Sequence, residues 1–186
     1  MAEVGQESGI MPKALVLSLL LAGVAGAQAV DVPNADIQAM LRKVAAQRVS
    51  DQQMRVVSIN DEYNVGVGVV RRAKTSGRDA GGGIDHSQIT EVYHVMEGTG
   101  TFVTGGVIAN QKPFAPDSQV VKVLNGPSTN GGPIEGGVSR KVGPGDVIVI
   151  PPNTAHWFSE ITSDQIVYLV VRIDPHKVLP AGYVAK

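Results

Sequence analysis

The stretches HSQITEVYHVMEGTG (residues 86–100) and GDVIVIPPNTAHWF (residues 145–158) carry most of the information about the fold. Each holds a short run rich in β-branched and aromatic residues next to a Gly-rich or Pro-rich turn, which is the pattern of a β-strand. Each also carries side chains that bind metals: His86 and Glu91 in the first stretch, and His156 in the second. Two imidazoles and one carboxylate form the ligand set of an open site for a divalent transition metal.

The spacing of these residues resembles the two sequence motifs of the cupin superfamily. In the first stretch, four residues separate His86 from Glu91, as in germin-like members, and six residues separate Glu91 from Gly98. In the second stretch, a glycine, five further residues and a proline precede His156. The resemblance extends over roughly residues 65–173 in one register.

The resemblance implies an all-β fold, the cupin double-stranded β-helix or jelly-roll barrel, in which two antiparallel sheets curl around a common interior. The 22 glycines and 11 prolines, which separate many short β-branched runs, also favour an all-β domain. Because the sequence shows no internal repeat, we expect a single cupin domain with a short N-terminal helix.

Three positions depart from the family motifs. Ile84 stands where the first histidine of the first motif would fall, so the usual four ligands are reduced to three. Asn153 replaces a glycine, and asparagine also tolerates a left-handed backbone. Glu160 replaces the closing asparagine. The resemblance therefore implies a His86, Glu91 and His156 site.

The alternation of side chains along a strand predicts which residues face the barrel interior. If Glu91 points inward, Tyr93 does too and His94 points outward. By the same count, Phe158 and Glu160 share the inner face with His156. Tyr93 and Glu160 are therefore the candidate catalytic residues.

Gln88 has the same parity as His86, which makes it a candidate fourth ligand. Glu91 itself supports a metal site, because an unpaired buried carboxylate is costly without a cation. Such a ligand set suits Fe, Mn, Ni, Cu or Zn, and three protein ligands leave coordination positions open for a substrate, water or dioxygen.

Three classes of function follow. The first is a small-molecule enzyme that uses the metal, of the dioxygenase, oxidase, lyase or isomerase type. The second is a non-catalytic cupin that holds a sugar, another metabolite or a metal without turnover, and both a metal-bound and a metal-free form remain open. A storage role is a third reading, because some cupins are seed proteins.

Composition excludes several other classes. The net charge is −1, and only 4% of residues are aromatic, so neither a basic face nor stacking platforms for nucleic acid are expected. The absence of cysteine excludes disulfides, thiolate catalysis and cysteine-ligated zinc.

The N-terminus resembles a secretory signal peptide. An apolar run over residues 14–27 ends at Ala27-Gln28-Ala29, an A-x-A cleavage signature. We expect cleavage after Ala29 and a secreted or periplasmic protein with no membrane attachment after cleavage. Met11 is a candidate true start, and a buried N-terminal helix is the competing interpretation.

The remaining pattern predicts the organisation of the chain. Apolar positions 37, 40, 41 and 44 form one face of a helix that Asn34 can cap. A homodimer is expected through the outer sheet face, which carries Val92 and Met96. The expected segments are a signal peptide (1–29), an N-terminal helical segment (30–52), one cupin domain (53–176) and a loose polar tail (177–186).

Alternation also predicts the strands of the domain. A long connection between the two motifs, residues 105–144, holds one expected strand. The expected strands are 54–59, 63–72, 91–96, 101–104, 119–124, 146–150, a strand from residue 156, and 165–173.

Overall fold

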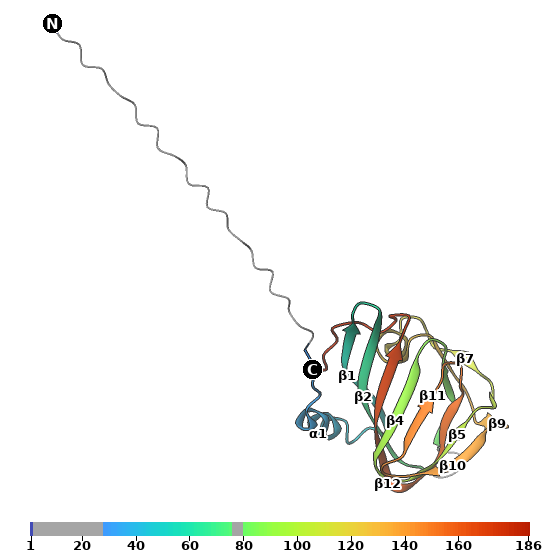
Figure 1. Cartoon of the computed structure of the whole chain (residues 1–186). Coiled ribbons are helices and arrows are strands. Elements are labelled where there is room, and N and C mark those ends of the chain that lie inside the picture. The colour runs from blue at the N-terminus through green and yellow to red at the C-terminus, as the bar shows by residue number, and fades with distance from the viewer. Residues whose placement is uncertain (2–27, 76–79) are drawn as a thin grey trace.

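The computed structural model describes Met1 and residues 28–75 and 80–186 (Figure 1). The expected signal peptide therefore lies almost wholly outside the described residues. The elements in chain order are α1 (Asn34–Lys43), β1 (Val49–Ile59), β2 (Tyr63–Thr75), β3 (Ile84–His86), β4 (Thr90–Glu97), β5 (Gly100–Thr104), β6 (Val107–Ile108), β7 (Lys112–Pro113), the π-helix η2 (Val120–Asn125), β8 (Ser128–Asn130), β9 (Ile134–Glu135), β10 (Val138–Val142), β11 (Val147–Ile150) and β12 (His156–Asp174).

Ten of these strands form one antiparallel sheet that curls into a barrel, which confirms the all-β jelly-roll prediction (Figure 1). The long strand β12 holds the curled sheet together. Its second half pairs with β2 on one side and β4 on the other, whereas its first half pairs with β3 and β5. Strands β6 and β9 form a separate two-stranded sheet.

β12 is continuous where the sequence suggested two strands. The register shifts between Phe158 and Glu160 opposite β5, and again between Ile161 and Gln165 opposite β2. Such bulges bend a strand and change which face its side chains occupy. Because of these bends, one strand can pair with β3 and β5 in its first half and with β2 and β4 in its second half.

The barrel interior is filled by the inward residues of six strands, β2, β4, β5, β10, β11 and β12. Tyr93 and Val95 of β4 lie opposite Val170 and Tyr168 of β12, and all four are buried. This is the period-two alternation that the sequence predicted for the strand within the first motif, residues 91–96. The interior core also contains Val70, Phe102, Val142, Ile148, Ile150, Phe158, Ile161 and Ile166.

Helix α1 packs on the outside of the sheet through the predicted apolar face. Ile37, Met40 and Val44 are buried against Met54, Val69 and Val167, with Leu41 at the edge of this cluster. Asn34 is not the cap: the helix begins at Asn34 itself, after Pro33, without a side-chain cap. No helix in the described part of the chain is long and apolar enough to cross a membrane.

The connection between the motifs differs from the prediction. The run over residues 119–124 forms η2 and not a strand, and five short strands, β6 to β10, lie in this connection. The hydroxyl of Ser118 accepts a hydrogen bond from the Val121 N–H at 3.3 Å, which favours the start of a helical turn. Gly126, with a φ of 64°, ends it.

The C-terminal tail is ordered against β1, so the expectation of a loose tail was wrong. Leu179 is buried, and the carboxylate of Asp174 accepts hydrogen bonds from the N–H groups of residues 178 and 179. Further along, Val56 N–H donates to the Tyr183 carbonyl at 3.1 Å. Strand β1 also begins at Val49, four residues before the expected domain boundary.

Candidate metal centre

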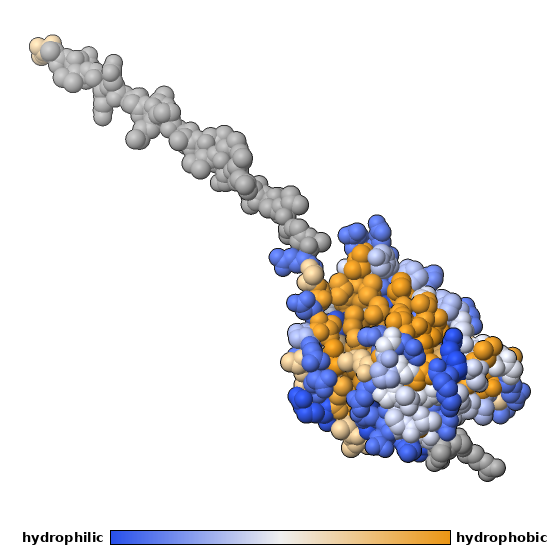
Figure 2. All heavy atoms as spheres, turned by 60° about the horizontal axis from the view of Figure 1, so that its bottom comes forward, coloured by the Kyte–Doolittle hydropathy of each residue, from blue (hydrophilic) through white to orange (hydrophobic). Residues whose placement is uncertain are grey.

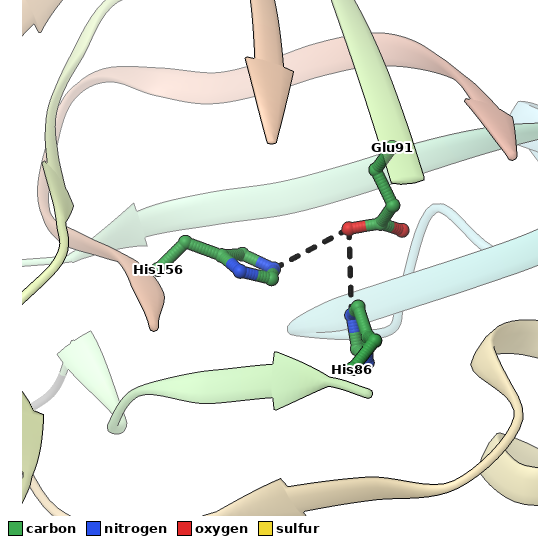
Figure 3. Close-up of side chains that lie close together, drawn as sticks. All are labelled: His86, Glu91 and His156. Carbon is green, nitrogen blue, oxygen red and sulfur yellow. Dashed lines mark ion pairs between the residues drawn. The ribbon is translucent and has the colours of Figure 1, made fainter. Parts of the chain in front are cut away.

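Three strand ends bring the expected ligands together. His86 is the last residue of β3, Glu91 lies at the start of β4, and His156 is the first residue of β12 (Figure 3). Pairing of β3 with β12 places Ile84 opposite His156, and pairing of β4 with β11 places Ile150 opposite Glu91. The hydrogen-bonded ladder therefore sets the positions of all three side chains.

The three side chains point at one another inside the barrel. The Nε2 atoms of His86 and His156 each lie 3.4 Å from Oε2 of Glu91 (Figure 3). The two imidazole rings are 5.1 Å apart between centroids. One donor atom from each residue lies within 4.8 Å of the other two, and all three residues are almost fully buried, at 3%, 1% and 3% exposure.

Hydrogen bonds outside the cluster fix the tautomer of each histidine. Nδ1 of His156 lies 2.9 Å from the carbonyl oxygen of Thr154, which can only accept, so Nδ1 carries the proton. Nδ1 of His86 lies 2.8 Å from Oγ of Ser128, and that hydroxyl donates its own hydrogen to the Gly126 carbonyl. Nδ1 of His86 is therefore also the donor.

Because each Nδ1 holds the ring hydrogen, each Nε2 presents a lone pair to the carboxylate. Burial lowers the pKa of His86, which favours the neutral ring. Nε2 of His156 is buried without a hydrogen-bond partner. Two nitrogen lone pairs and a carboxylate oxygen thus face one another. A divalent transition metal fits this arrangement, because imidazole nitrogens and carboxylate oxygens are ligands that such ions bind.

Two further groups contact the Glu91 carboxylate. The hydroxyl of Tyr93 donates to Oε2 at 2.9 Å, and Nε of Arg172 donates to Oε1 at 3.2 Å. Burial alone would raise the pKa of Glu91, but the interactions of the carboxylate hold that pKa well below its usual value, and with both imidazoles neutral the charged partner is the Arg172 guanidinium. Burial and the Glu91 charge raise the pKa of Tyr93, which therefore keeps its proton.

Arg172 corrects one step of the sequence argument. The sequence predicts a buried carboxylate without a protein partner at Glu91, whereas the structure pairs it with a buried arginine. The case for a metal therefore rests on the two converging imidazole nitrogens and not on an unpaired charge.

The other sequence candidates differ from the three ligands in burial and in position. Gln88 lies on the bend between β3 and β4 and is only partly buried, so strand parity does not apply to it. His94 is exposed on the outer face of β4, as strand parity predicted. Phe158 is buried in the interior, where its ring packs on Phe102 at 4.7 Å between centroids.

Glu160 is not on the interior wall, which corrects the expectation from strand parity. The bulge between Phe158 and Glu160 inserts one extra residue and turns the following side chain outward. The Glu160 side chain is 44% exposed, and its carboxylate lies 3.3 Å from Nζ of Lys141. Tyr93, the other catalytic candidate, does contact the cluster.

Sequence reasoning missed Ser128 and Arg172. Ser128 lies in the Gly-rich connection, where no periodicity marks it. Arg172 did carry a signal: it has the same parity as Tyr168 and Val170 in an otherwise apolar run. A charged residue on the inner face of a buried strand indicates a partner inside the barrel.

The cupin family model matches residues 85–182, more than half of the chain, and this range contains all three cluster residues. The chain therefore belongs to the cupin family. No curated protein matches it.

Solved structures with a similar course of the chain include three bacterial proteins. A Bacillus halodurans protein is 13% identical, with a TM-score of 0.47 over 86% of this chain and 90% of the other. The DMSP lyase DddQ from Ruegeria pomeroyi is 13% identical, with a TM-score of 0.46 over 84% and 70%. The putative sugar phosphate isomerase from Acidithiobacillus ferrooxidans is 15% identical, with a TM-score of 0.35 over 59% of this chain and 49% of that chain.

Proposed function

We propose that this protein is a metal-dependent cupin that acts on a small molecule, with His86, Glu91 and His156 as the protein ligands of one Fe, Mn, Ni, Cu or Zn ion. The observation that carries the proposal is the pair of Nε2 lone pairs that face Oε2 of Glu91, each fixed by a hydrogen bond from its Nδ1. In metal sites, histidine ligands commonly donate their second ring N–H in this way.

The residues around the ligands have defined tasks in this proposal. A bound ion with open positions supplies Lewis-acid or dioxygen chemistry to a small molecule. Tyr93 keeps a proton next to Oε2 of Glu91 and can donate a hydrogen bond within the site. The packed rings of Phe102, Phe158 and Tyr168 keep water from the opposite side of Tyr93.

The test is elemental analysis of untagged protein followed by a substrate screen with the metal that is found. We expect close to one transition-metal ion per chain, removable by a chelator and restored by the same ion. A protein that takes up none of the five ions during dialysis would contradict the proposal. A screen over small polar and phenolic molecules then separates oxygen-dependent reactions from lyase or isomerase reactions.

One observation favours a second candidate, a metal-free cupin that binds a sugar or another metabolite. The ion pair between Glu91 and Arg172, at 3.2 Å, already compensates the carboxylate without a metal. This candidate expects purified protein with an organic ligand bound and no metal. Mass spectrometry of denatured protein, alongside the elemental analysis, distinguishes the two.

We also propose that the chain forms a homodimer through the outer face of the sheet. Val147 and Val149 of β11 are 63% and 62% exposed, and Val149 pairs with the partly buried Val92. Figure 2 shows apolar side chains gathered over much of one face of the molecule. Exposed apolar areas of this kind are typical of association surfaces.

Export is the last part of the proposal. The apolar run over residues 14–27 and the A-x-A signature support cleavage after Ala29 and a secreted or periplasmic location. Intact-mass analysis of protein made in its native host tests this: we expect a mature chain that begins at Val30. Retention of Met1 or Met11 would contradict it.

A further inference from the structure

Among the described residues, Arg172 is the largest of the fully buried side chains, and its guanidinium contacts the Glu91 carboxylate of the candidate metal centre. Strand pairing places Arg172 opposite Glu91. Its Nε donates to Oε1 of Glu91 at 3.2 Å, on the side of the carboxylate away from the two imidazoles. The Arg172 guanidinium thus holds one oxygen of the carboxylate while the other oxygen faces the histidines.

The far side of the guanidinium is anchored to β1. Nη1 donates to Oε1 of Gln53 at 2.9 Å, and Nη2 donates to Oδ2 of Asp51 at 2.5 Å. Because a guanidinium is planar and its donors have a fixed geometry, three acceptors on two strands leave it little freedom to rotate. Burial opposes its charge, but the Asp51 and Glu91 carboxylates hold the pKa of Arg172 above its usual value.

Two glycines of β2 make room for this network. A Cβ at Gly68 would lie 2.9 Å from Nη1 of Arg172, and a Cβ at Gly66 would lie 2.7 Å from Nε2 of Gln53. Glycine inside a strand usually marks a bulge or the close approach of another group. Here the approaching groups are the side chains of Arg172 and Gln53, so the interior is built to accommodate them.

We propose that Arg172 is a positioning residue that reserves Oε2 of Glu91 for the metal and prevents Oε1 from joining it. This inference rests on the proposed metal site and goes further, because it assigns one-oxygen coordination to Glu91. A carboxylate can bind an ion through one or both oxygens, and the second oxygen would fill a position that a small ligand needs. Arg172 therefore keeps the ion open to a substrate.

The test uses protein loaded with Co(II), whose absorption spectrum reports the coordination of the ion, and azide as a small anionic probe. Arg172→Lys keeps the charge, but its single nitrogen cannot span the three acceptors that Nε, Nη1 and Nη2 of the guanidinium reach in different directions. In Arg172→Lys, we expect the Glu91 carboxylate to bind Co(II) through both oxygens, which changes the Co(II) spectrum. The dissociation constant of azide should rise about tenfold, because losing a residue that hydrogen-bonds a metal ligand has an effect of this size.

The matched control is Arg71→Lys. Arg71 also lies in the sheet and bonds a side chain, Gln165, but it has no contact with the cluster. We expect this variant to match the wild-type protein in Co(II) spectrum and azide affinity. If Arg172→Lys does not fold, Gln53→Met removes one anchor of the guanidinium and keeps its charge, and the same shift in azide affinity is expected.

The outcomes separate the two proposals. Co(II) uptake by the wild-type protein is measured first, and its absence overturns the proposed metal function itself. Uptake by the wild type with an unchanged spectrum and azide affinity in Arg172→Lys overturns only the role of Arg172. A folded Arg172→Lys protein that takes up no Co(II) also overturns one-oxygen positioning, because Arg172 would then hold the site together.

Discussion

The hydroxyl of Ser128 lies 2.8 Å from Nδ1 of His86 and donates its own hydrogen to the carbonyl of Gly126, so it acts only as an acceptor toward the imidazole. This contact connects β8 to the last residue of β3 and decides which nitrogen of His86 carries the proton. Because Nδ1 is the donor, Nε2 is left with a lone pair that points at Glu91. A residue in the Gly-rich connection thereby orients the imidazole of the proposed metal ligand His86.

Ser128→Ala tests this relationship. Without the hydroxyl, the buried Nδ1–H loses its acceptor and the other tautomer, with the proton on Nε2, gains population. We expect metal affinity to fall about tenfold to a hundredfold, as is typical when a partner behind a ligating histidine is lost. Competition titration with a metal chelator measures the affinity, and the nitrogen chemical shifts of His86 in the metal-free protein report the tautomer.

Ser87→Ala is the control for Ser128→Ala. Ser87 also lies close to β3, but its hydroxyl donates to the Pro127 carbonyl at the surface and makes no contact with the cluster. We expect its metal affinity to equal that of the wild-type protein. An unchanged affinity in Ser128→Ala as well would show that the hydroxyl does not position His86.

The ligand set itself is tested by exchanging histidines one at a time. His86→Ala or His156→Ala removes one of three donors, so metal uptake should be lost while far-ultraviolet circular dichroism stays that of the wild-type fold. His94→Ala should leave uptake unchanged, because the His94 side chain is exposed on the opposite face of β4. Loss of metal in His94→Ala with uptake retained in His86→Ala would show that the assigned ligands are wrong.

Most of the fold follows from sequence patterns, because strict alternation survives wherever a strand is straight. Residues 91–96 alternate between the interior and the outer face as predicted. The prediction failed at Glu160, where a bulge shifts the register by one residue and reverses the orientation of the side chain. Bulges depend on the partner strand, so their positions are not visible in the sequence of one strand.

The candidate site was predictable in its ligands but not in its surroundings. His86, Glu91 and His156 are marked by motif spacing, whereas Ser128 comes from a segment without periodicity. Residues 119–124 show the same difficulty: a short apolar run does not distinguish a strand from a helical turn. In the folded chain the Val121 N–H donates to the Ser118 hydroxyl, an interaction of a helical turn that the apolar pattern does not reveal.

The pH dependence of the metal-free protein follows from His86. Its pKa is lowered in the folded state from the ordinary value of 6.5, so below that pH the unfolded chain binds a proton that the folded chain does not. Stability should therefore fall as the pH drops from 7.5 to 5.5. Thermal unfolding in the presence of a chelator measures this, and His86→Gln should show a smaller loss over the same range.

Gly98, the last glycine of the first motif, is expected to be required for the backbone of the β4–β5 turn. Its φ is +80°, and a Cβ there would lie 1.9 Å from the carbonyl oxygen of Gln165. Gly98→Ala should lower the free energy of unfolding by more than about 1 kcal/mol. Gly182→Ala is the matched control: Gly182 has a φ of +79°, but a Cβ there would meet no atom within 4 Å. Urea unfolding of both variants therefore separates the cost of the steric clash at Gly98 from the cost of the positive φ.

The proposed dimer contact on the outer face of the sheet can be tested at Val149. If Val149 lies in a contact between two copies, a charge at this position is buried without a partner in both of them, because a twofold contact uses the same patch twice. Val149→Glu should therefore convert the dimer to a monomer, measured by light scattering coupled to size-exclusion chromatography. Val107→Glu is the control: Val107 is 68% exposed, but it belongs to the separate β6–β9 sheet, so the dimer should persist. A wild-type protein that is monomeric at all working concentrations would contradict the proposed dimer, and a dimeric Val149→Glu variant would place the contact elsewhere on the molecule.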